Sequence, residues 1–68
     1  MNSTIDTSEG TFTGRTVDSI VRREFGRTAE VRVIADPNSP TYGMVVKADR
    51  HQVAAYHVLA TIYSVQEA

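Results

Sequence analysis

The chain has 68 residues, of which 41% are hydrophobic, and a formal net charge of -1. This length corresponds to one domain, and the near-neutral charge excludes a global attraction to nucleic acid or to an anionic membrane. Domains this small bury only about 60% of their unfolded surface and commonly rely on disulfides, metals or oligomerisation. Because the chain has no cysteine, oligomerisation is the expected source of added stability.

The first fourteen residues are polar and rich in Ser and Thr. They predict a flexible N-terminal tail over residues 1–14, in which Thr11–Phe12–Thr13 is the one segment suited to a short edge strand. The chain shows no basic start with an apolar run, as a secretory signal would, and no apolar segment long enough to span a membrane. We expect a cytoplasmic protein that does not bind a membrane.

A short helix is predicted from Thr16 to Phe25. Thr16 is a favourable N-cap, and Val17, Ile20 and Val21 recur at helical spacing. Gly26 supplies the residue at which helices commonly end. Local signals therefore agree over the whole segment.

Two strands are predicted next, over residues 29–35 and 44–48. The first alternates apolar and polar residues, and the second is short and mostly apolar. The segment from Asp36 to Gly43 contains both prolines and must be a loop. Antiparallel pairing is the simplest arrangement, because a parallel crossover needs more residues.

The C-terminal segment, residues 50–66, carries conflicting signals. Asp49 followed by Gln52 resembles a capping box, and the length of the segment favours a helix. The run from Tyr56 to Val65 is rich in β-branched and aromatic residues, which suit a strand. We expect a helix, with the strand left open. The predicted fold class is therefore α+β: a single domain over 15–68, ordered helix-strand-strand-helix with an antiparallel strand pair and completed by dimerisation.

As a helix, this segment would be apolar on two sides, of which a two-stranded sheet covers only one. The second side predicts a protein interface, and tyrosine is enriched at interface hot spots. An equally weighted alternative is that Tyr56 and Tyr63 belong to the core. The predicted interface residues are Tyr42, Tyr56, Val58, Leu59, Ile62 and Tyr63.

Arginines gather in the middle of the chain and could contact phosphates. Acidic residues interleaved with them weaken the positive charge, and a solvated helix end accounts for the same pattern. The candidate nucleic-acid contacts are Arg15, Arg22, Arg23, Arg27 and Arg32.

The sequence contains no catalytic or metal-binding motif. His51 and His57 would point in different directions on a helix, and no hydroxyl lies in a nucleophile motif such as G-x-S-x-G. A chain this short also has little room for a pocket of catalytic size. We expect no enzyme activity, no metal and no cofactor.

The pattern FTGRTVDSIVRREFG, then a predicted strand, then ADPNSPTYGMVVKAD resembles the small accessory proteins encoded by phages of high-GC actinobacteria. The resemblance covers most of the chain, implies a virus-encoded protein acting on a host or viral component, and transfers no functional residue. The expected function is a non-enzymatic protein-binding or regulatory module that acts as a homo-oligomer and binds an unidentified protein. The alternatives are a nucleic-acid-binding regulator that uses residues 15–32, and a small structural subunit of a viral particle.

Overall fold

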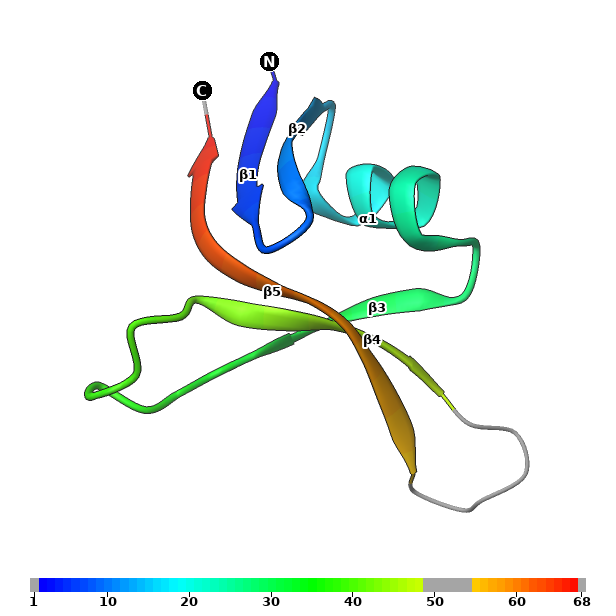
Figure 1. Ribbon diagram of the computed structural model, residues 1–68. Helices are drawn as coiled ribbons and strands as arrows, with labels where there is room; N and C mark the ends of the chain where they lie inside the picture. Colours follow the sequence, from blue (N-terminus) through cyan, green and yellow to red (C-terminus); the bar gives the residue numbers. More distant parts are fainter. Residues whose placement is uncertain (1, 49–54, 68) are drawn as a thin grey trace.

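A five-stranded antiparallel sheet dominates the computed structural model, which describes residues 2–48 and 55–67 (Figure 1). The strands lie in the order β2-β1-β5-β4-β3, and one helix connects β2 to β3. The elements are β1 (Ser3–Thr7), β2 (Gly10–Gly14), α1 (Val17–Phe25), β3 (Ala29–Val33), β4 (Gly43–Ala48) and β5 (Tyr56–Glu67).

The predicted helix-strand-strand-helix α+β fold is wrong at both ends of the chain. The helix over 16–25 and the two strands in the middle are present as α1, β3 and β4. Residues 3–14, assigned to a flexible tail, instead form the β1–β2 hairpin, and most of the predicted second helix is the strand β5. The proposed Asp49–Gln52 cap lies outside the described residues.

The β1–β2 hairpin forms because its threonines both favour strands and close the turn. Thr7 Oγ1 donates to the Gly10 carbonyl at 2.7 Å and accepts from the Glu9 amide at 3.1 Å. Gly10 has a φ of 132°, which suits glycine at the end of the turn. The hairpin also supplies Ile5, which is fully buried. The polar composition of residues 3–14 therefore led to a predicted tail, although this hairpin contributes a side chain to the core.

β5 is long because it pairs with different neighbours along its length. Its first half pairs with β4 and its second half with β1, so it joins two parts of the sheet (Figure 1). Val45 pairs with Ala60 and Val46 with Val58, which makes Leu59 the extra residue of a β-bulge. Tyr63 is likewise extra in the pairing with β1. A twelve-residue strand is stable here because two neighbours share its hydrogen bonds.

The core lies between α1 and one face of the sheet, here called the inner face. Ile20 and Val21 of the helix pack against residues from four strands. The fully or nearly fully buried residues of this cluster are Ile5, Ile20, Val21, Ala29, Val45, Ala60 and Ile62. Phe12 and Phe25 add an edge-to-face ring contact at 5.9 Å, so β2 is held against the end of the helix.

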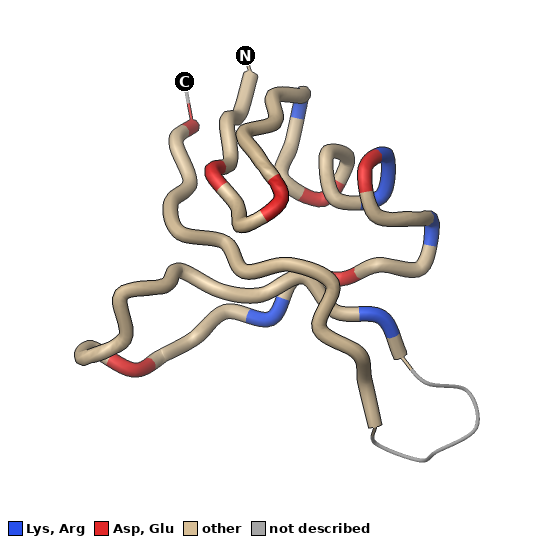
Figure 2. Tube along the Cα trace, in the orientation of Figure 1, with Lys and Arg blue, Asp and Glu red and all other residues tan. Residues whose placement is uncertain are grey.

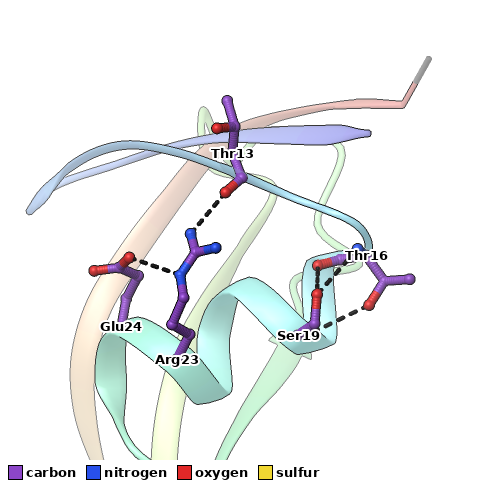
Figure 3. Close-up of polar contacts among 5 residues, drawn as sticks. All are labelled: Thr13, Thr16, Ser19, Arg23 and Glu24. Atoms are coloured by element: carbon purple, nitrogen blue, oxygen red, sulfur yellow. Dashed lines mark hydrogen bonds and ion pairs between the residues drawn. The ribbon is translucent and has the colours of Figure 1, made fainter. Parts of the chain in front are cut away.

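The start of α1 is fixed by a reciprocal cap. Thr16 Oγ1 accepts from the Ser19 amide, and Ser19 Oγ accepts from the Thr16 amide, each at 3.1 Å (Figure 3). These two bonds satisfy amides that a helix start otherwise leaves unpaired. The predicted N-cap at Thr16 is confirmed.

Ile62→Ala tests the position of β5 in the core. We expect a loss of about 2–5 kcal/mol in the free energy of unfolding, because the change leaves a cavity beneath α1. The neighbouring change Tyr63→Ala should cost less than about 1 kcal/mol, since Tyr63 is 49% exposed. Urea denaturation followed by circular dichroism measures both. Equal losses would contradict the assignment of Ile62 to the core.

Candidate protein-binding face

The second face of the sheet, here called the outer face, lies opposite α1. Val45 belongs to the core beneath the helix, so its neighbour Val46 points to the other side of β4. Cross-strand partners share a face, and the pairings with β3 and β5 therefore extend this surface. The outer face of β3, β4 and β5 consists of Glu30, Arg32, Met44, Val46, Ala48, Tyr56, Val58 and Thr61.

Apolar side chains dominate the middle of the outer face. Val46 is only 2% exposed, whereas its partner Val58 is 56% exposed and Tyr56 is 51% exposed. Val46 lies between Glu30 and Val58 on the outer face, and it is not part of the core cluster under α1. Its burial is therefore due to neighbours on the outer face. The result is an apolar strip along β4 and β5, with the ring of Tyr56 at the start of β5.

Two further tyrosines lie where β5 turns from β4 toward β1. Tyr63 is the bulge residue and Tyr42 precedes β4; they are 49% and 44% exposed. The Tyr42 amide donates to the Ile62 carbonyl at 2.8 Å, which brings the backbone of Tyr42 beside the bulge. Both ends of the β4–β5 pairing therefore carry exposed tyrosine.

The structure divides the predicted interface residues into two groups. Tyr42, Tyr56, Val58 and Tyr63 are exposed. Ile62 is fully buried, and Leu59 is partly buried and packs against the core, so neither is among the exposed side chains. Helical geometry had grouped residues that a bulged strand places on opposite faces.

The structure does not bring the five predicted arginines together. Arg23 donates from Nη2 to the Thr13 carbonyl at 2.6 Å and from Nε to Glu24 at 3.0 Å, which ties α1 to β2 (Figure 3). Arg32 lies on the outer face, where its Nη2 is 3.5 Å from Glu30 Oε2. Arg15, Arg22 and Arg27 are exposed on or beside the helix. Figure 2 shows basic and acidic positions interspersed over the helix and strands.

Sequence reasoning missed the contribution of β3 and β4 to this surface. Met44 and Val46 extend the apolar strip, whereas Val33 of β3, which is 64% exposed, pairs with Gly43 and lies on the inner face. The uninterrupted apolar run at the start of β4 was the available signal, because a strand with both faces apolar needs cover on both sides.

Across 2–48 and 55–67, no group of three His, Asp or Glu side chains could hold a metal ion. His51 lies outside these ranges, so its geometry with His57 is not described. In the same ranges, no helix has the length and apolar character needed to cross a membrane.

Comparisons with protein-family models, curated proteins and solved structures find no match for this chain.

Gly43→Ala tests the close β3–β4 contact that supports the outer face. A Cβ atom at Gly43 would lie 2.7 Å from the Arg32 carbonyl oxygen, so the two backbones would have to separate. We expect a loss of about 1–3 kcal/mol in the free energy of unfolding. Lys47→Ala, at an exposed position of the same strand, should change it by less than about 0.5 kcal/mol. Thermal denaturation of the two variants measures the difference, and an unchanged Gly43→Ala variant would contradict the contact.

Proposed function

We propose that the protein is a non-enzymatic protein-binding module that acts as a homo-oligomer and contacts its partner through the outer face. The observation that carries this proposal is the apolar strip of the outer face, with exposed Tyr56 and Val58 on the side of the sheet that α1 does not cover. Contiguous apolar surface of this kind is typical of protein contact sites.

The composition of the strip favours a protein surface as its partner. Tyrosine rings provide a large contact area at a low entropic cost and keep a polar hydroxyl for the rim of an interface. Met44, which is half-buried, adds an aliphatic side chain to the strip, and buried Val46 lies opposite exposed Val58. A partner that presents aliphatic or aromatic side chains would complete the burial of this strip.

A nucleic-acid partner has weaker support. Binding to phosphates needs several basic side chains within reach of one backbone. Arg23 is already engaged by Thr13 and Glu24, and Arg32 lies beside Glu30 on the opposite side of the sheet from the helix. The remaining arginines are too few to form a continuous basic track.

The resemblance to phage accessory proteins gives the proposal a cellular setting. Under it, the module is virus-encoded and acts in the host cytoplasm on a host or viral protein. A role as a structural subunit of a virus particle would use the same outer face.

A photo-crosslinking amino acid at position 58 tests the protein contact. We expect position 58 to give a discrete protein crosslink in host lysate, and the same probe at Asp18, exposed on α1, to give none. A Tyr56→Ser change in the position-58 variant should reduce the product at least about fivefold, as expected for a hot-spot residue worth more than about 1 kcal/mol. Equal crosslinking from both positions, or a product unaffected by Tyr56→Ser, would contradict the outer-face site.

Salt titration of fluorescent DNA and RNA binding tests the alternative. We expect weak binding that does not change when Arg22→Ala and Arg27→Ala are combined, since these exposed arginines do not form a phosphate site. Tight, salt-dependent binding that the double change abolishes would instead favour a nucleic-acid regulator.

A further inference from the structure

The two edges of the sheet differ in how they are covered. Arg23 reaches from α1 to the Thr13 carbonyl of β2, and the Phe12–Phe25 contact holds the helix against the same strand. β3 pairs with β4 on one side, and no described residue pairs with its other side. Unprotected strand edges readily accept another strand.

The free edge of β3 presents the backbone groups of alternate residues. The Ile34 amide donates to the Tyr42 carbonyl at 3.1 Å, on the side of β4. Antiparallel alternation then directs the amide and carbonyl of Val31 and Val33 away from β4. The Ala29 amide is engaged by the Gly26 carbonyl at 3.1 Å, so Ala29 offers its carbonyl.

The charges on this edge are symmetric about Val31. Glu30 precedes it and Arg32 follows it, and both side chains lie on the outer face. Edge strands usually prevent self-association with charges that repel an identical strand. These two do the reverse, because antiparallel pairing centred on Val31 places each glutamate opposite an arginine. A centre on Glu30 or on Arg32 would bring identical charges together.

We propose that a second copy of this chain pairs with β3 in antiparallel fashion, with Val31 opposite Val31 of the partner subunit. Glu30 then lies opposite Arg32 of the partner subunit, and the reciprocal pair forms by symmetry. The Val31 amide of each copy donates to the Val31 carbonyl of the other copy. The Val33 amide donates to the carbonyl of Ala29 of the partner subunit. Val33, which is 64% exposed in the single chain, gains a neighbour on the inner face.

This arrangement specifies how the homo-oligomer in the proposed function is built, and it rests on that part of the proposal. The two sheets become one continuous sheet with a twofold axis at β3. Their outer faces lie on the same side, so the apolar strips of both copies are available to a partner protein at the same time. Two linked contact sites bind more tightly than one.

Charge reversal combined with sedimentation equilibrium tests the register. Glu30→Arg and Arg32→Glu should each lower the dimerisation constant about tenfold or more, because each replaces two attractive pairs with two repulsive ones. An equimolar mixture of the two variants should recover dimers at wild-type concentration or below, since one chain then presents two cations and the other two anions. Glu9→Arg, an equal charge change in the β1–β2 turn, should leave dimerisation unchanged.

Single cysteines provide a second measurement, because the natural chain contains none. Residues 30 and 32 of opposite copies would form a non-hydrogen-bonded pair with Cα atoms about 4.5 Å apart, close enough for a disulfide. We expect mild oxidation to give more crosslinked dimer from a mixture of Glu30→Cys and Arg32→Cys than from either variant alone.

Two results would overturn the β3 pairing. One is a wild-type chain that stays monomeric up to about 1 mM, which excludes any useful self-affinity. The other is a dimer whose stability is unaffected by the charge reversals and their mixture, which would place self-association elsewhere. Neither result affects the crosslink at position 58, so failure of the edge pairing is distinguishable from failure of the outer-face site.

Discussion

The structure depends on the hydrogen bonding of β5 to two different neighbours. Without β5, the β1–β2 hairpin and the β3–β4 pair would be separate two-stranded units, which are marginal in water. Ile62 lies where the two pairings meet and is fully buried beneath α1. The helix then covers the joined inner face. One strand thus converts two weak hairpins into a single sheet with a core.

The bulges in β5 determine which side chains remain outside the core. The bulge at Leu59 lets Leu59 and Ala60 both contribute to the core side, while Val58 stays on the outer face. The bulge at Tyr63 leaves this ring exposed beside buried Ile62. The two β-bulges of β5 therefore leave exposed the side chains that we propose as a binding surface. The open edge of β3 is a separate feature, and the proposed pairing of two copies there would leave the outer face free.

Local signals in the sequence identified the middle of the chain and failed at its ends. The cap at Thr16, the apolar spacing of α1 and the prolines of the following loop are encoded within short segments, and they predicted α1, β3 and β4. Whether residues 56–67 form a strand or a helix depends on pairing with β1, which lies far away in the sequence and was predicted to be part of a flexible tail. With β1 missing, β5 had no second neighbour and a helix was favoured. Tyr56 and Val58 were among the predicted interface residues and are exposed, although a core position for Tyr56 was given equal weight.

Nuclear Overhauser contacts in the 15N- and 13C-labelled protein test the central position of β5 most directly. The account predicts cross-strand contacts from Ala60 to Val45 of β4 and from Val65 to Ile5 of β1, in one and the same molecule. Medium-range contacts between residues three apart over 56–67, as in a helix, without contacts to β1, would contradict it. In that case the joined sheet, its outer face and the open β3 edge would all have to be abandoned.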